Sequence, residues 1–574
     1  MKIINTYKFL LVIIFFSFVF RGLYLNYVPT ATNNDQLHYL LDGKSMYVTG
    51  KNLAGDRSLF DILMFHYPKN ETVQAELPYI FSIITVGPFS FSLAHAAMLS
   101  VFLGVGVVIL LYFIGKFLIN EKFGVILALL ASSNPWFISM SRSSYEMISA
   151  TFFYLLTFFI FQIAKGKYLY LAIPAMLLSF YSYIGTKLIF LPFVAICIVY
   201  SYLVLQKKKY KKEFIIIFSF SVLLMAFFFF QLSRQPELSR VNELFLPWNS
   251  HVTKNVDHLR HVSLVSPLSS IVDNKYTVYV RTVIANIANV FSPGYLFEYG
   301  DYFYSLERYG IFHIIDAAFL IIGCIFFFTK MKKKSVVFLF LIGISILPQI
   351  FHDPEGTGNF TPHITLLIPF LLIVIAYGIY FLIELDEVKK YRKVICLFII
   401  GAYLASLLHF SQVYFFHHPL VGNIVSFPNR AVASYISRAS QSKKIVAHVS
   451  NPQLSVRDYL FYANAMNNKN VSEVSSKLRN KNYVFKNVLF VQCTDEVDER
   501  GATVVYESMC NHKTKENGLE LAQLRDSAAA YEINNDNLCS RFGQKNFISS
   551  VPFRNLHIEA ISDKEFCETY VINL

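Results

Sequence analysis

A short polar stretch, Ser141 to Glu146, separates two long apolar runs and contains an arginine and a carboxylate. The runs, residues 123–140 and 147–164, each approach the roughly 20 residues that a helix needs to cross a bilayer. Ionisable residues in such a setting indicate function unless they face water or a partner. Arg142 and Glu146 are four residues apart, so one helical turn would place them on one face. The alternative is a solvated loop with a structural ion pair.

A second carboxylate, Asp35, follows the first apolar run. Apolar residues at helical spacing after it predict an interfacial helix, and Asp35 could also simply cap that helix. Another outward stretch begins at Glu76 and continues to His95, and we expect a second interfacial or re-entrant helix there.

Two basic residues, Lys187 and Arg308, are expected at the same membrane surface. Either could bind a lipid phosphate, the arginine as a fork and the lysine as a point charge. Either could instead extend its charged end to water along an apolar surface. Arg308 closes an aromatic, turn-rich segment that includes Phe291 to Asp301.

Composition identifies a polytopic membrane protein. Of 574 residues, 55% are hydrophobic and 16% are charged, whereas soluble domains have about 25% charged residues. The net charge of +13 does not indicate a nucleic-acid partner, because the lysines form short clusters between apolar runs.

The apolar runs predict about eleven spans, the first of them uncleaved. Every second connection carries a basic cluster and is expected in the cytoplasm. These clusters are Lys116 with Lys122, Lys165 with Lys167, 207–212, 330–334 and 389–393. The other connections, and everything after about Gln412, are therefore expected outside the cytoplasm.

After about Pro428 the long apolar runs stop and short β-type runs appear, which predicts a soluble α/β domain over 428–574 behind a membrane module over 1–427. Strands are expected at 444–449, 487–492, 503–506, 556–561 and 569–574, and a helix at 519–531. Four cysteines in an exported domain suggest two disulfides with three connectivities. We favour the sequence neighbours, Cys493–Cys510 and Cys539–Cys567.

The outward motifs, in this order, resemble the GT-C glycosyltransferases, and in particular the clan of protein O-mannosyltransferases and lipid A aminoarabinose transferases. The likeness runs from about Arg21 to Pro419. It comprises Asp35, the pattern from Pro135-Trp136 through Ser141-Arg142 to Glu146, then Tyr181, Tyr183 and Lys187, the run from Phe291 to Asp301, Pro362-His363, and Tyr414-Phe415-Phe416. The chain departs from the family pattern at Gln36, Glu76-Leu77-Pro78 and Leu366.

The resemblance implies transfer of a sugar from a polyprenyl-phosphate donor in the outer leaflet to a hydroxyl of an envelope acceptor, which is a protein, lipid A or another glycan. One carboxylate would act as general base, and Asp35 is our choice, with inversion at the anomeric carbon. Arg142 and Glu146 complete the predicted catalytic set. Lys187, Arg308 and His363 would bind the donor phosphate, and Glu76, Tyr183 and Asp301 would line the acceptor or sugar pocket. A divalent cation, Mg²⁺ or Mn²⁺, at Asp35, Glu76 and Glu146 is compatible with the sequence but not required.

Two readings without catalysis stay open. A flippase or transporter of lipid-linked sugars would favour charged residues in the middle of spans or broken helices in paired halves. A membrane scaffold would use the tail domain to bind a partner. The ionisable residues at span ends on one predicted side favour the enzyme.

Overall fold

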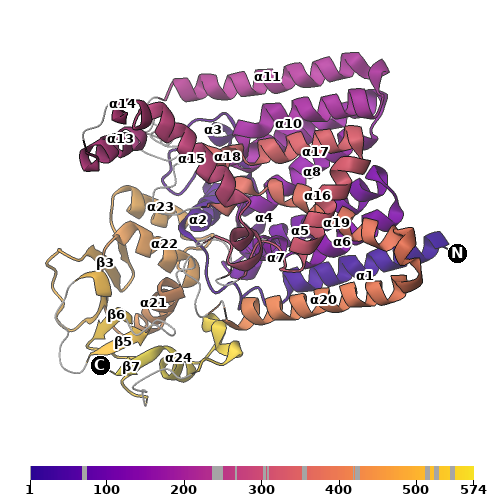
Figure 1. Ribbon diagram of the computed structural model, residues 1–574. Helices are drawn as coiled ribbons and strands as arrows, with labels where there is room; N and C mark the ends of the chain where they lie inside the picture. Colours follow the sequence, from indigo (N-terminus) through magenta and orange to yellow (C-terminus); the bar gives the residue numbers. More distant parts are fainter. Residues whose placement is uncertain are drawn as a thin grey trace.

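The protein consists of a bundle of long helices and a sheet domain packed against one end of it (Figure 1). The computed structural model describes residues 2–67, 74–235, 250–264, 268–301, 306, 309–351, 359–417, 419, 427–510, 518–522, 529–542 and 550–573. The chain starts at the far end of the bundle and finishes in the sheet domain (Figure 1). This architecture confirms the predicted class, a polytopic helical membrane protein with a C-terminal α/β domain.

The bundle is built from apolar helices that lie side by side (Figure 1). They are α1 (Lys2–Gly22), α5 (Leu93–Leu118), α6 (Glu121–Ser133), α7 (Pro135–Ser141), α8 (Met147–Ile163), α9 (Ala172–Ser182), α10 (Lys187–Val199), α11 (Lys211–Ser233), α16 (Asp316–Lys330), α17 (Lys332–Ser345), α19 (Leu367–Glu384) and α20 (Arg392–Gln412). In the described part of the chain six helices are long and apolar enough to cross a bilayer, or seven if α6 and α7, bent by 59°, form one span. The number of about eleven spans stays a prediction.

The basic connections meet at one end of the bundle, as their alternation predicted. Lys122 lies 2.9 Å from Glu384 at the end of α19. Lys334 donates to the carbonyl of Leu118 at the end of α5, and Lys207 donates to the carbonyl of Ala164 after α8. These contacts join connections that are far apart in the sequence, so one end of the bundle collects the positive charge.

Short helices of the first loop lie at the other end of the bundle, where α2 lies beside the sheet domain (Figure 1). They are α2 (Asn34–Thr49), α3 (Leu59–Leu63) and α4 (Leu77–Thr85), and they include the two predicted interfacial helices. α2 and α4 cross closely at Gly43, where a Cβ would lie 2.4 Å from the Cβ of Ser82. The segments α13 (Ser250–Val262), α14 (Ser269–Val272) and α15 (Lys275–Val290) also lie at this end (Figure 1).

The sheet domain has seven strands in the order β2-β3-β1-β4-β6-β5-β7. β1 pairs in parallel with β3 and β4, and the other pairs are antiparallel. The strands are β1 (Ile445–Val449), β2 (Val484–Phe485), β3 (Val488–Gln492), β4 (Thr503–Glu507), β5 (Leu519–Ala522), β6 (Ala529–Asn534) and β7 (Val571–Asn573). The helices of this domain are α21 (Phe427–Ala439), α22 (Pro452–Tyr462), α23 (Val471–Arg479) and α24 (Asp563–Tyr570).

Two local predictions in this domain are wrong. The segment 519–531, expected as a helix, contributes strand residues to β5 and β6, because pairing with β6 and β7 outweighs its helical propensity. The segment 556–561, expected as a strand, contains short 3₁₀ turns that lie against α21. In both places tertiary contacts overrule the local pattern.

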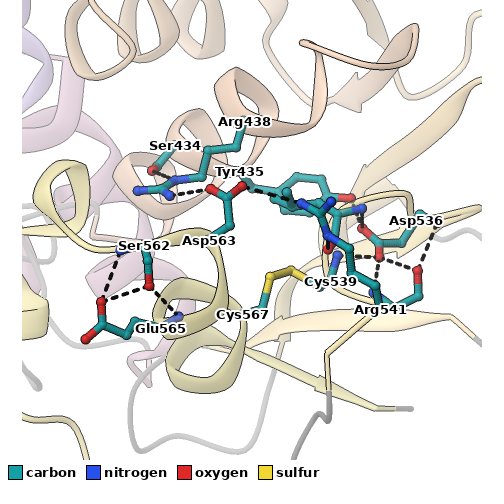
Figure 2. The surroundings of a disulfide bond; sticks show 12 residues. Ser434, Tyr435, Arg438, Asp536, Cys539, Arg541, Ser562, Asp563, Glu565 and Cys567 are labelled. Carbon is teal, nitrogen blue, oxygen red and sulfur yellow. Dashed lines mark hydrogen bonds and ion pairs between the residues drawn. A yellow bond between two sulfur atoms is a disulfide. The ribbon is translucent and has the colours of Figure 1, made fainter.

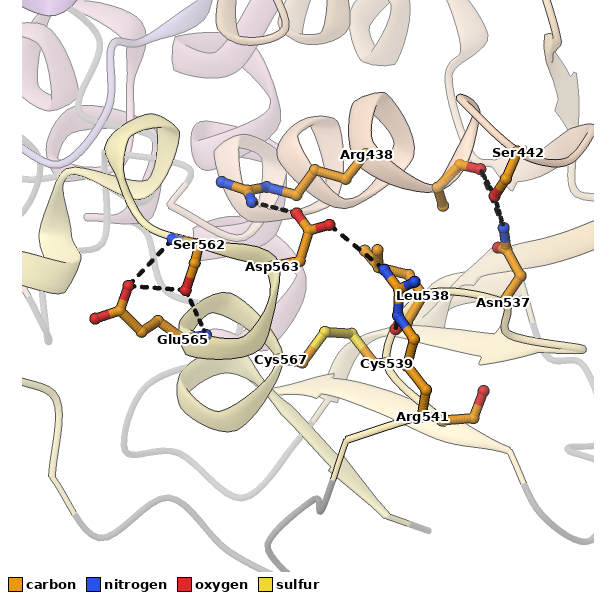
Figure 3. A network of polar contacts seen from close by, with 12 residues as sticks. Arg438, Ser442, Asn537, Leu538, Cys539, Arg541, Ser562, Asp563, Glu565 and Cys567 are labelled. Carbon is orange, nitrogen blue, oxygen red and sulfur yellow. Dashed lines mark hydrogen bonds and ion pairs between the residues drawn. A yellow bond between two sulfur atoms is a disulfide. The ribbon is translucent and has the colours of Figure 1, made fainter.

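Two disulfides tie this domain together, and they join the pairs that the sequence favoured, Cys493–Cys510 and Cys539–Cys567. The second links the turn after β6 to α24 (Figure 2). Beside it, Asp563 at the start of α24 lies 2.7 Å from Arg438 of α21 and 3.5 Å from Arg541 (Figure 3). The disulfide and the ion pairs thus fix α24 on the turn after β6 and on α21.

Candidate functional site

The Asp35 carboxylate lies in the first turn of α2 and is exposed. It does not cap the helix. Asn33 is the cap: its side chain accepts from the Gln36 N–H, and the Gln36 side chain accepts from the Asn33 N–H. The capping alternative for Asp35 is therefore wrong, because the reciprocal pair already occupies these positions. Asp35 is left to accept from the Tyr145 hydroxyl, 3.5 Å from Oδ2.

A buried tyrosine, Tyr39, lies one turn after Asp35 in α2. Its hydroxyl accepts from the Ala75 N–H, and its ring meets that of Tyr79 edge-on at 4.9 Å. Burial, and then the charge of Glu146, hold the pKa of Tyr39 well above its usual value, with smaller contributions from Tyr79 and Asp35. Tyr39 therefore stays protonated next to two carboxylates. Asp35 and Glu146 thus both raise the pKa of the same buried tyrosine, and their membership of one site stays a prediction.

Arg142 is buried and binds backbone instead of Glu146. Its guanidinium donates to the carbonyls of Phe20 at 2.8 Å and Val28 at 2.7 Å, and it lies over the Phe415 ring at 4.9 Å. In the described chain Arg142 and Glu146 form no ion pair. The helical-turn expectation fails because α7 ends at Ser141 and α8 begins at Met147, so residues 142–146 are not one turn of helix.

Glu146 directly precedes α8 and is buried. It lines a small pocket between the first-loop helix α4 and the bundle helices α5 and α8, together with Pro78, Thr85, Ser144 and Ser149. The pocket also includes Tyr145, whose hydroxyl reaches Asp35. One short turn of chain therefore supplies both a buried carboxylate and a partner for the exposed one.

Lys187 and Glu76 form a buried ion pair, with 2.6 Å between Nζ and Oε1 and exposures of 4% and 0%. The same carboxylate oxygen accepts from the Tyr67 hydroxyl at 2.8 Å. The rings of Phe65 and Phe228 lie 4.8 and 4.5 Å from the ammonium. The sequence assigned these two residues to different subsites; in the structure each is the other's partner.

Three further predicted residues, Tyr183, Asp301 and His363, lie around the start of α19. Asp301 accepts from the Thr361 N–H at 2.6 Å, and the Tyr295 hydroxyl lies 2.8 Å from the Thr361 hydroxyl. His363 is buried in the same 3₁₀ turn, Thr361–Ile364, with the ring of Tyr183 at 6.5 Å. Tyr183, Asp301 and His363 are thus brought together, whereas Arg308 lies outside the described residues.

The donor set expected for a divalent cation does not fit a metal. Within the ranges that the structure describes, no three His, Cys, Asp or Glu side chains are close enough to hold an ion. Glu76 in particular points to Lys187 and Tyr67.

Arg21 has a structural role that the sequence reading missed. It is fully buried, its Nε donates to the Ser141 hydroxyl at 3.2 Å, and its terminal nitrogens donate to the carbonyls of Ala131 and Ser132 at 3.1 Å. The two carbonyls lie in the last turn of α6, just before the break to α7, so Arg21 satisfies carbonyls that the break leaves without helix partners. An arginine at the end of an apolar run was the only signal.

No family model matches the chain, and no curated protein sequence matches it. Three similar solved structures are those of the archaeal oligosaccharyltransferase AglB from Archaeoglobus fulgidus in complex with an inhibitory peptide and a dolichol-phosphate, and of ArnT from Cupriavidus metallidurans bound to undecaprenyl phosphate and in the apo state. AglB is 12% identical, with 88% of this chain and 70% of that chain covered and a TM-score of 0.46. The two ArnT structures are 9% and 10% identical, with 93% and 88% of this chain and 98% and 93% of theirs covered and TM-scores of 0.49 and 0.47.

Proposed function

We propose that this protein is an integral-membrane glycosyltransferase that moves a sugar from a polyprenyl-phosphate donor to a hydroxyl of an envelope acceptor. The observation that carries the proposal is the environment of Asp35. It is an exposed carboxylate, at the end of a membrane bundle where the short interfacial helices lie, and its contact is the Tyr145 hydroxyl. A lipid-linked sugar presented at the membrane surface would lie at that level.

The proposed reaction is a single displacement. Asp35 takes the proton of the acceptor hydroxyl while the oxygen of that hydroxyl attacks the anomeric carbon from the face opposite the phosphate. The bond from that carbon to the phosphate oxygen breaks, and its electron pair leaves with the lipid phosphate. The configuration at the anomeric carbon is inverted. The phosphate is a good leaving group, so the reaction needs no general acid.

The charged neighbours have proposed roles that follow their positions. Glu146, buried beside Tyr145 and Tyr39, orients the base or the acceptor. Arg142 fixes the turn that carries Glu146 to the end of α1. His363 and Arg308 are the proposed partners of the donor phosphate, whose developing charge favours nearby cations, whereas the Lys187 ammonium is held by Glu76.

The acceptor side is proposed to involve the group around α19 and the first loop. Tyr183 and Asp301 lie with His363, so an acceptor there would approach the same end of the bundle as Asp35. Glu76 forms an ion pair with Lys187, so its proposed contribution is to fix the position of that ammonium. We place this end of the bundle and the C-terminal domain outside the cytoplasm, because the basic connections lie at the opposite end.

The test is transfer from a panel of radiolabelled polyprenyl-phosphate sugars in membranes that contain broad envelope acceptors. Wild type is compared with Asp35→Asn and with Asp56→Asn, which removes another exposed carboxylate of the same loop. We expect one donor to be consumed by wild type and Asp56→Asn, and the rate to fall about 10²–10⁴-fold in Asp35→Asn. A donor consumed equally by all three would retain the enzyme class and reject Asp35 as base. No consumption of any donor would reject the function.

A further inference from the structure

The first loop and the C-terminal domain share one hydrophobic core. A single buried cluster contains Leu37, Leu40 and Leu41 of α2 together with domain residues from Phe427 to Val571, among them Phe461 of α22 and Val474 of α23. Burying apolar area stabilises at about 25 cal/mol per Å², so neither part keeps this stabilisation without the other. The C-terminal domain is therefore part of the packing of the helix that carries Asp35.

Buried polar contacts hold the chain just before α2. Arg430 of α21 is 1% exposed and donates to the carbonyls of Thr30 at 2.6 Å and Asn26 at 3.2 Å. The Tyr462 hydroxyl, at the end of α22, accepts from the Thr32 N–H at 2.8 Å. Thr32 directly precedes the cap of α2, so these bonds fix the position at which the helix begins.

The chain after α2 is held from the same domain. Ser475 of α23 donates to the Leu53 carbonyl at 2.7 Å. Gly55, at φ +76°, packs so closely on α23 that a Cβ there would lie 2.0 Å from Nη2 of Arg479. Asn464 exchanges two hydrogen bonds with the backbone of Phe91, which precedes α5.

We propose that Arg430, Tyr462 and Ser475 are positioning residues that fix both ends of α2 and thereby the Asp35 carboxylate. The inference rests on the proposed role of Asp35 as base. A base must stay within hydrogen-bond reach of the acceptor proton, and a displacement of about 1 Å can cost about 10²-fold in rate. Asp35 is exposed, and its contact with Tyr145 is long at 3.5 Å. The position of its carboxylate therefore depends mainly on the position of α2.

The experiment compares Tyr462→Phe and Arg430→Lys with Tyr459→Phe in the purified full chain. Tyr459 is a matched control, because it is a buried tyrosine of the same helix whose ring packs against Phe490 of β3 at 5.5 Å. Two quantities are measured: kcat and KM for the donor, and hydrogen exchange of the amides of residues 30–41. Thermal unfolding identifies any variant that fails to fold, and the Tyr462→Phe variant, which removes one hydroxyl, keeps the test available if Arg430→Lys does not fold.

We expect kcat to fall about 10-fold to 100-fold in Tyr462→Phe and Arg430→Lys, with KM for the donor changed less than twofold. Amide exchange at the start of α2 should become at least 10-fold faster, and Tyr459→Phe should match wild type in both measurements. Unchanged exchange and unchanged kcat in Tyr462→Phe would overturn the inference, as would equal losses in Tyr459→Phe. If wild type transfers no sugar, the proposed function fails while the exchange data still decide whether the domain fixes α2.

Discussion

Two carboxylates of the first loop, Asp35 and Glu76, have opposite environments. Glu76 is fully buried and bound by Lys187 and Tyr67. Asp35 is exposed and accepts from one hydroxyl at 3.5 Å. Both are acidic residues close to an interfacial helix, and their sequence neighbourhoods do not separate them.

Glu76 thus stabilises the fold, whereas Asp35 is accessible for a chemical reaction. Two charges that are buried away from water lose their hydration, and their mutual attraction has to offset that cost. The two side chains must therefore stay in contact. An exposed carboxylate can exchange its water for an acceptor hydroxyl at little cost.

The largest effect is expected at the buried pair. Glu76→Gln leaves the Lys187 ammonium buried without its anion, and we expect a loss of about 3–5 kcal/mol in the free energy of unfolding. Lys187→Met alone should cost a similar amount, and the double variant should recover most of the loss in a double-mutant cycle.

The control for this cycle is the exposed pair between Lys122 and Glu384, where the lysine side chain is 71% exposed. Removing it should change stability by less than about 1 kcal/mol. Equal costs for the two pairs would mean that the pair at Lys187 is hydrated, and the comparison with Asp35 would lose its basis.

An intermediate effect is expected at Asp458, a buried carboxylate of α22 whose partner is the neutral amide of Asn429 at 2.8 Å. Burial raises the pKa of Asp458 to about 7. The native state therefore binds a proton that the unfolded chain releases above about pH 4. The contribution of this group to stability is complete at low pH and is lost as the pH rises towards 7.

Asp458→Asn should accordingly stabilise the protein by about 1–3 kcal/mol at pH 8 and change it little at pH 4. Asp495→Asn, at an exposed position, is the control and should change the free energy of unfolding little. Thermal unfolding at both pH values measures the difference. A pH-independent effect of Asp458→Asn would show that this carboxyl does not take up its proton on folding.

The smallest effect is expected at Tyr145. Tyr145→Phe removes the hydroxyl that reaches Asp35 at 3.5 Å. We expect kcat to fall about two- to tenfold, the range of an ordinary net hydrogen bond, because the contact is long. A loss as large as that of Asp35→Asn would instead make Tyr145 a reacting group.

Much of the fold could be read from the sequence, because long apolar runs and basic clusters reflect the bilayer itself. The C-terminal change in composition, the strands β1, β3, β4 and β7, and the helices α2 and α4 follow from local pattern. The failures are at 519–531 and 556–561, where strand pairing and packing on α21 decided the conformation. Local propensity carries no information about such distant partners.

The sequence by itself determined which residues could do chemistry and on which end of the bundle they would gather. Only the tertiary structure decided how each is used: Arg142 binds the carbonyls of Phe20 and Val28, Glu76 is closed on Lys187, and Asp35 is left exposed. The physical reason is that a side chain is buried and bound by segments that are far away in the sequence. Arg430 and Tyr462, for example, bind the chain just before α2. Residue type sets what a side chain can do, and its surroundings in the fold select which of these it does.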